Sequence, residues 1–164
     1  GEDMRVGKVL MVLALGLFMV LAAFNNVLTW GGAFSADGAV AMTIGMQETG
    51  QHPNLMWRAI DSPIIVALGA IGIILVEIAA GVLALWGALN MWKARADSAA
   101  DFHASKEKGL LGLSVMAVLY LLGFQAVAGE WFMVWQTPAP TILAAFINLA
   151  MALLVMLWVN TKDD

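Results

Sequence analysis

Residues 63–92 read PIIVALGAIGIILVEIAAGVLALWGALNMW, and Glu77 is the only charged residue among them. Asp61, Ser62 and Pro63 open this stretch as a helix start, because a capping side chain followed by proline suits the first helical turn. At about 1.5 Å per residue, a helix of this length crosses a hydrocarbon layer of about 30 Å. The stretch therefore predicts a membrane-spanning helix.

Three further stretches have the same character. Apolar residues make up 62% of the chain and charged residues only 12%, whereas average soluble domains have roughly 45–50% and about 25%. We expect spans over about 6–28, 63–92, 109–134 and 140–159, within a single membrane domain covering residues 1–164. The sequence thus predicts an all-α integral membrane four-helix bundle.

The basic residues predict the orientation of this bundle. Arg58 alone falls on the side of segment 31–61, the outer segment between the first two spans. All the others fall with the termini and loop 93–108, namely Arg5, Lys8, Lys93, Arg95, Lys106, Lys108 and Lys162. The positive-inside rule therefore predicts that both termini and loop 93–108 are cytoplasmic. The outer segment is apolar enough to predict two short helices, near Ala36–Met46 and Asn54–Ile60.

Several classes of chemistry are disfavoured by what the chain contains. It has no cysteine, which excludes disulfides, thiolate chemistry and attached haem. Both histidines, His52 and His103, fall outside the predicted spans, where they cannot ligate a membrane haem. A net charge of −4 argues against nucleic acid as a partner. We see no catalytic constellation, so we expect no enzyme, no cofactor and no metal site.

Glu77 is the one ionisable residue near the middle of a predicted span. A charged side chain at that depth costs at least about 2.5 kcal/mol, so Glu77 should face protein or water. Small residues at helical spacing support an inward orientation, because such a seam lets helices approach closely. These are Ala70, Gly81, Ala84 and Ala88.

Each of the other spans carries polar residues at a similar depth. Together with Glu77 they form a predicted intramembrane polar layer of Asn25, Asn26, Tyr120, Gln125 and Asn148. In one interpretation Glu77 is neutral and hydrogen-bonds to Asn148, Tyr120 or Gln125, which fixes the helix register. In the other, the layer is a proton or ion relay, or a site for a polar head group.

A second group is expected at the outer membrane interface. Glu130 lies beside Trp131, and we expect it to pair with Arg58. Trp57, Trp135 and Gln136 fall at the same level. Tryptophan is enriched at membrane interfaces, and this group therefore marks the outer boundary of the bundle.

Three segments carry a resemblance to a known family. Trp57-Arg58-Ala59-Ile60, the intramembrane Glu77 and the string GEWFMVWQ over 129–136 resemble a bacterial domain-of-unknown-function family of predicted small four-span integral membrane proteins. The resemblance covers nearly the whole chain and implies a four-helix architecture in a bacterial inner membrane, without an activity. The chain departs from the family pattern at Thr29-Trp30, at 46–49 and at 137–140, where polar residues of the pattern are replaced.

Three functions are compatible with these observations. The first is an accessory or structural subunit that packs against a larger membrane complex, such as a respiratory or photosynthetic assembly; a homo-oligomer is the alternative partner. The second is a small transporter or proton-conducting carrier that uses Glu77 and the polar layer. The third is a lipid or quinone binder with Glu130, Arg58 and the outer tryptophans around a head group. We favour the accessory role on sequence alone.

Overall fold

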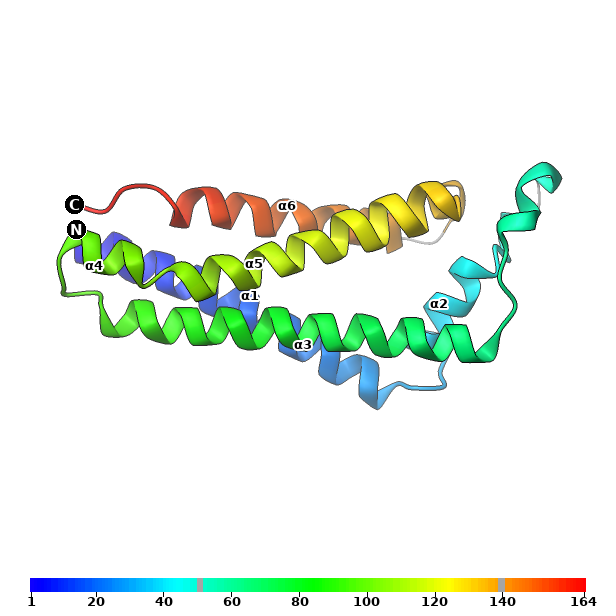
Figure 1. The fold of residues 1–164 in the computed structure, drawn as a ribbon, viewed down its shortest axis with the longest axis horizontal. Coiled ribbons are helices and arrows are strands. Elements are labelled where there is room, and N and C mark those ends of the chain that lie inside the picture. The colour runs from blue at the N-terminus through cyan, green and yellow to red at the C-terminus, as the bar shows by residue number, and fades with distance from the viewer. Residues whose placement is uncertain (50–51, 139–140) are drawn as a thin grey trace.

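The structure is a computed structural model that describes residues 1–49, 52–138 and 141–164. Across these ranges the chain is helical and contains no strand. Its helices that are long and apolar enough to cross a membrane are Glu2–Leu28 (α1), Pro63–Lys93 (α3), Ala99–Trp131 and Thr141–Val159 (α6). The all-helical, four-span prediction is therefore confirmed (Figure 1). Pro140, the predicted start of the fourth span, lies outside the described residues.

Shorter elements complete the chain. The segment between α1 and α3 contains α2 (Ala36–Ile44) and a 3₁₀-helix, η1 (Pro53–Arg58). The third long stretch consists of α4 (Ala99–Ala104), α5 (Glu107–Val118) and a π-helix, η2 (Leu119–Trp131). A 3₁₀ turn, η3 (Val134–Gln136), follows before α6. Helical structure thus occurs in the outer segment near both places where the sequence predicts it.

Helix starts follow from local capping. The Ser62 hydroxyl accepts a hydrogen bond from the Ile65 amide at 3.3 Å, and Pro63 occupies the first turn, as predicted. The Ser98 hydroxyl accepts from the Asp101 amide at 3.1 Å, so the predicted cap of the third stretch is also present. Such side chains satisfy amides that have no partner within the helix.

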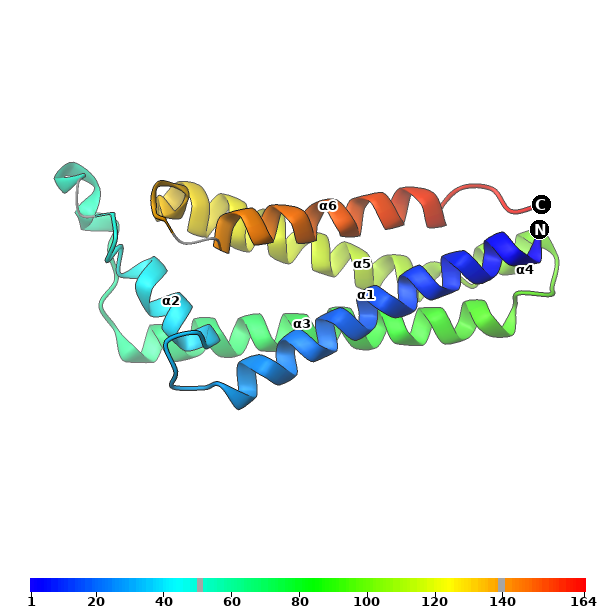
Figure 2. The same cartoon turned by 180° about the vertical axis from the view of Figure 1, so that it is seen from behind.

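The long helices form two arms (Figures 1 and 2). In the first arm α1 packs along α3, and in the second α6 packs along α5 and η2. The arms meet at the end that carries both termini and α4, which we call the terminal end. They diverge toward the opposite end, which carries α2 and which we call the α2 end.

Small residues bring the arms together toward the terminal end. A Cβ atom on Gly87 of α3 would lie only 2.0 Å from the backbone nitrogen of Gly109 on α5. One on Gly112 would lie 2.6 Å from the backbone nitrogen of Ala84. Ala84 and Ala88 are almost fully buried. The small-residue seam of α3 is therefore used for contacts within the chain.

The polar tail after α6 continues to the terminal end, where two buried lysines share one carboxylate. Lys8 Nζ lies 2.7 Å from Asp163 Oδ1, and Lys106 Nζ contacts Asp163 Oδ2. Both ammonium groups also donate to the Thr161 carbonyl, at 3.0 and 3.1 Å. Burial opposes the charge of Asp163, but hydrogen bonds from Lys106 and Lys8 outweigh this effect and hold the pKa of Asp163 below its ordinary value.

Arg5 completes this terminal cluster, which we define as Arg5, Lys8, Lys106 and Asp163. The Arg5 guanidinium donates to the carbonyls of Arg95, Asp97 and Asp164 at 2.7–3.0 Å. Its Cζ also lies 5.1 Å from the centre of the buried Phe102 ring, within range of a cation–π interaction. The cluster ties the start of α1 to the loop after α3 and to the tail.

Candidate functional site

Glu77 lies inside the fold near the point where the arms diverge. Glu77 is only 4% exposed, in agreement with the inward orientation predicted from the small-residue seam. Asn26 of α1 donates from Nδ2 to Glu77 Oε1 at 2.8 Å. Oε2 accepts no hydrogen bond from the residues that the structure describes. The predicted hydrogen bond between Glu77 and Asn148, Tyr120 or Gln125 is therefore wrong for Oε1, because Asn26 is its donor.

Only one of the paired asparagines takes part in this contact. Successive residues of an α-helix point about 100° apart, so Asn25 and Asn26 cannot face α3 together. Asn26 is half-buried against Glu77, whereas Asn25 is exposed. The structure thus separates Asn25 from the polar layer in which the sequence places it.

The remaining polar residues of the predicted layer have partners of their own. The Tyr120 hydroxyl donates to Met19 Sδ at 3.8 Å and lies beside Asn148 of α6. Gln125 donates from Nε2 to the Ile142 carbonyl at 3.1 Å, which ties η2 to α6. Asn26, Glu77, Tyr120 and Asn148 are therefore near one another, whereas Asn25 is exposed and Gln125 bonds to the backbone of α6.

A cavity of about 400 Å³ lies between the arms and reaches Glu77. Its walls come from the end of α1, from α2 and the residues before it, from α3, from η2 and the residue after it, and from the first residue of α6. They are Asn26, Phe34, Ser35, Ala36, Ala39, Val40, Thr43, Ile44, Gly69, Ile73, Glu77, Leu119, Gly123, Phe124, Val127, Ala128, Phe132 and Thr141. The volume falls in the range of ligand pockets, about 300–1,000 Å³.

The lining is mostly apolar, with Glu77 and Asn26 as its strongest polar groups. Along α3 the wall runs through Gly69, Ile73 and Glu77, which are spaced four residues apart and so share one helical face. Glu77 is the furthest of the three from the α2 end. The cavity opens where Phe34 is 97% exposed and Val127 45% exposed. An apolar pocket with a few converging polar groups is the usual form of a small-molecule site.

The π-helix η2 forms the wall opposite α3. Its wider turn aligns residues four and five apart. The cavity-lining positions of η2 and of Phe132, the residue just after it, follow this spacing in two rows, 119, 123, 127 and 124, 128, 132. Gly123 in the middle of the first row leaves room, because a Cβ there would meet only Leu119 Cδ1, at 3.6 Å. Sequence reasoning missed this element, since an α-helix presents four-residue spacings as well.

The predicted outer group is assembled around Arg58, but differently from the prediction. Arg58 Nη1 donates to the Trp131 carbonyl at 3.2 Å, and its Cζ lies 4.5 Å from the centre of the Trp131 ring. Trp57 packs edge-on against Trp131 with ring centres 5.7 Å apart. The described residues include no ion pair between Arg58 and Glu130, which is exposed. The expected carboxylate partner is thus replaced by a carbonyl and an aromatic face.

Trp135 and Gln136 lie in η3, beyond the cavity. Trp135 is exposed, and Gln136 is half-buried with an Oε1 atom that has no hydrogen-bond partner among the described residues. The two residues follow Met133, whose φ of 61° places its backbone in the left-handed region. The arrangement turns the chain sharply after η2 and does not bring Gln136 to Arg58 or Glu77 by any hydrogen bond in the described part of the chain.

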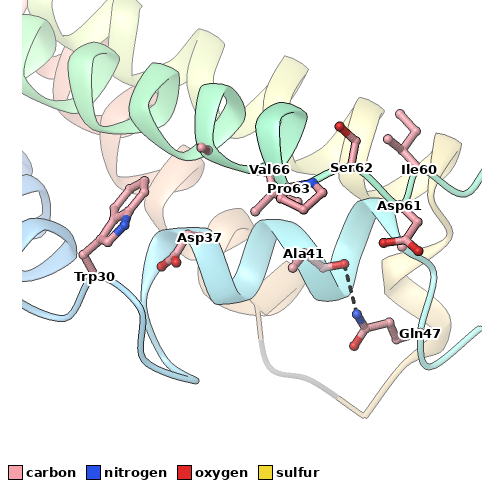
Figure 3. Close-up of a pocket in the computed structure, with 11 residues that line it drawn as sticks. Trp30, Asp37, Ala41, Gln47, Ile60, Asp61, Ser62, Pro63 and Val66 are labelled. Atoms are coloured by element: carbon pink, nitrogen blue, oxygen red, sulfur yellow. Dashed lines mark hydrogen bonds between the residues drawn. The ribbon is translucent and has the colours of Figure 1, made fainter.

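A second hollow of about 630 Å³ lies outside the bundle between α2 and the start of α3 (Figure 3). Asp37, Asp61 and Gln47 border it, and Gln47 donates to the Ala41 carbonyl at 3.4 Å. A hydrogen bond from the Ser35 hydroxyl holds the pKa of Asp37 below its ordinary value. Within the described ranges, no three His, Asp or Glu side chains gather as a metal site would require. The hollow therefore has fewer features of a ligand-binding site than the cavity at Glu77.

Comparisons with known proteins address the chain as a whole. No curated protein and no solved structure matches it. A family model described as "Predicted small integral membrane protein (DUF2165)" matches residues 4–162. That match covers α1 through α6 and includes Asn26, Glu77 and η2. The chain therefore belongs to this family of predicted small integral membrane proteins.

Proposed function

We propose that this membrane protein binds a small lipid-soluble molecule in the cavity beside Glu77. The observation that carries the proposal is a buried carboxyl group with one oxygen left without a hydrogen bond from the described residues, in an otherwise mostly apolar cavity of about 400 Å³. The role is binding, without catalysis. A molecule with one polar group and an apolar body, such as a lipid or a quinone, matches an apolar lining that contains one carboxyl group.

The polar end of such a ligand would meet Glu77 and Asn26. A protonated carboxyl accepts through one oxygen and donates through the other, whereas a carboxylate accepts through both. Since Asn26 already donates to Oε1, Oε2 remains for the ligand. Oε2 is not among the buried side-chain atoms that lack a partner in the described residues, so it is accessible from the cavity. A ligand hydrogen bond or charge at this point would stabilise the complex.

The accessory role remains a second proposal, but the structure changes its support. The sequence argument relied on glycine and alanine seams as surfaces for a neighbouring protein. The seam of α3 packs instead against α1 and α5, with Gly16 and Gly81 at one contact and Gly87 and Gly109 at another. A larger complex or a homo-oligomer would therefore have to use other faces of the helices.

We also propose that the terminal end faces the cytoplasm of a bacterial inner membrane. The support is the distribution of basic residues, since both termini and α4 lie together and Arg58 lies at the α2 end. The chain contains no cysteine, so single cysteines can be introduced without background. Labelling of intact cells with an impermeant maleimide should reach Asn54→Cys and not Ser98→Cys. The reverse pattern would overturn the orientation.

The binding proposal is tested by purification from native membranes in mild detergent, followed by native mass spectrometry. Wild-type protein should retain a small molecule. Gly123→Leu should lose it, because the added side chain enters the cavity, whereas Gly72→Leu is a matched control, because a Cβ at Gly72 meets no heavy atom within 4 Å and the residue does not line the cavity. A ligand-free wild-type protein, or equal retention by both variants, would contradict the proposal.

The same preparation addresses the accessory role. Comigration with a large complex at fixed stoichiometry would support it, and would leave the cavity as a contact site or a lipid site within that complex. Migration as a monomer or small homo-oligomer would count against an accessory role. The two results are independent, because ligand retention is read from the mass of the chain itself.

A further inference from the structure

Glu77 has no charged partner in the structure. Ion pairs among the described residues are Lys8–Asp163, Lys106–Asp163 and Arg95–Glu2, all at the terminal end. Asn26, its hydrogen-bond partner, is neutral. Of the residues that line the cavity, Glu77 alone is acidic and none is basic. The cavity therefore contains one potential negative charge and no side chain that would neutralise it.

Aromatic side chains also line the cavity. Phe124 of η2 and Phe132, just after η2, line the cavity, and Phe34 lies at the opening. Phe132 is only 5% exposed, and the Phe124 ring lies against that of Tyr120 with centres 5.3 Å apart. The face of an aromatic ring carries partial negative charge, and it attracts ammonium groups within about 6 Å. Rings and carboxyl thus favour the same sign of charge in a ligand.

We propose that the ligand of this cavity is a lipophilic organic cation, an aromatic or aliphatic body that carries a protonated or quaternary amine, with Glu77 as its counter-ion. The inference rests on the proposed binding function and specifies its ligand class. The ammonium group lies at Glu77 Oε2, and the apolar body lies along α3 and η2 toward Phe34.

The alternatives fit the same lining less well. An anionic head group such as a phosphate would face a carboxyl without any basic residue in the lining, and like charges in a poorly solvated site repel strongly. A neutral hydroxyl or carbonyl would gain a single hydrogen bond. A cation gains ion pairing with Glu77, and the aromatic side chains in the lining favour a positive charge over a negative one.

The test compares three probes that share one body and differ in head-group charge, namely phenylbutylamine in its protonated form, phenylbutanol and phenylbutyrate. Each is titrated against wild-type protein in lipid nanodiscs, with binding followed by saturation-transfer NMR. Gly123→Leu, in which the cavity is filled, provides the blank for partition into lipid. We expect the ammonium probe to bind roughly tenfold or more tightly than the alcohol, and the carboxylate to bind weakest.

Two variants assign the charge effect to its residue. Glu77→Gln keeps the shape and a hydrogen-bonding group, so alcohol binding should persist while the roughly tenfold advantage of the ammonium probe disappears. Glu130→Gln is the matched control, because Glu130 is an exposed carboxylate outside the cavity lining, and the advantage should remain. If Glu77→Gln does not fold, the three probes on wild-type protein still decide the question.

The outcomes separate this inference from the proposed function. Alcohol binding equal to or tighter than ammonium binding in the wild type would overturn the cation inference and leave the cavity as a binding site. Retention of the ammonium advantage in Glu77→Gln would also overturn it. If none of the three probes binds wild-type protein more than it binds Gly123→Leu, both the cation inference and the proposed binding function are overturned.

Discussion

The terminal end and the cavity where the arms diverge hold buried polar groups in opposite ways. At the terminal end Arg5, Lys8 and Lys106 are almost fully buried, and Asp163 together with backbone carbonyls of the tail and the loop provides their partners. Where the arms begin to diverge, Glu77 is also buried, but it has one amide partner and a cavity beside it. The charges at the terminal end are compensated within the chain, whereas Glu77 has no charged partner among the described residues, and we propose that a ligand binds there.

The largest effect should come from breaking the compensation at the terminal end. Asp163→Ala removes the carboxylate that Lys8 and Lys106 share, with side chains that are at most 3% exposed. Breaking a buried ion pair by removing one partner costs about 3–5 kcal/mol, because the remaining charge stays buried. Reversible unfolding in mixed micelles by increasing dodecyl sulfate should show a loss of this size.

Asp164→Ala is the matched control for this prediction. Asp164 contributes its backbone carbonyl to Arg5, and that group is unchanged by the substitution. We expect a change within about 0.5 kcal/mol, as for other surface substitutions. Equal destabilisation by the two variants would mean that the tail is held by general charge and not by the carboxylate of Asp163.

A smaller loss is expected when the close approach of the arms is prevented. In Gly87→Ala the new methyl group would lie 2.0 Å from the Gly109 backbone nitrogen, so α3 and α5 must separate. Overpacking of this kind costs typically about 1–3 kcal/mol. Gly72→Ala, where a Cβ meets no heavy atom within 4 Å, should be neutral in the same unfolding assay. Tolerance of Gly87→Ala would show that the arms are loosely joined.

Acid should weaken the terminal end by a smaller amount than the substitution of Asp163. The folded-state pKa of Asp163 lies below its ordinary value of 3.8, so its contribution to stability is present above that value and is lost as pH falls through the folded pKa. The protonated carboxyl keeps its shape and can still accept a hydrogen bond, which limits the loss. Unfolding measured from pH 5 to pH 2 should show this loss, and Asp163→Ala should flatten it.

Sequence reasoning recovered the spans because they depend on composition and on local capping. The predicted ends near 28, 63, 92 and 159 agree within a residue with those of α1, α3 and α6. Arg5, Lys8 and Lys106 were interpreted only as markers of orientation, because nothing local in the sequence indicates that the tail after α6 covers them. Long-range contacts of this kind, with sequence separations above 50 residues, have no local signal.

The candidate site was predicted only in part, because some of its features depend on local sequence and others on long-range contacts. The seam of small residues on α3 is local, and it correctly placed Glu77 inside the fold. Its partner could not be chosen from sequence, since Asn26, Tyr120, Gln125 and Asn148 all lie at a compatible depth on different helices. The cavity depends on the divergence of the arms and on the π-helix, and neither leaves a distinctive pattern in this chain.

The smallest effect on stability should come from Gly123→Ala, which tests the comparison most directly. The added Cβ would lie 3.6 Å from Leu119 Cδ1, an ordinary contact, and alanine lowers the backbone entropy that helix formation costs. We expect the free energy of unfolding to change by less than about 1 kcal/mol, in contrast to the clear loss expected for Gly87→Ala. Because the methyl group occupies part of the cavity, ligand retention should fall less than in Gly123→Leu. A destabilisation as large as that of Gly87→Ala would mean that the arms close around Gly123, and the open α2 end would then no longer contrast with the closed terminal end.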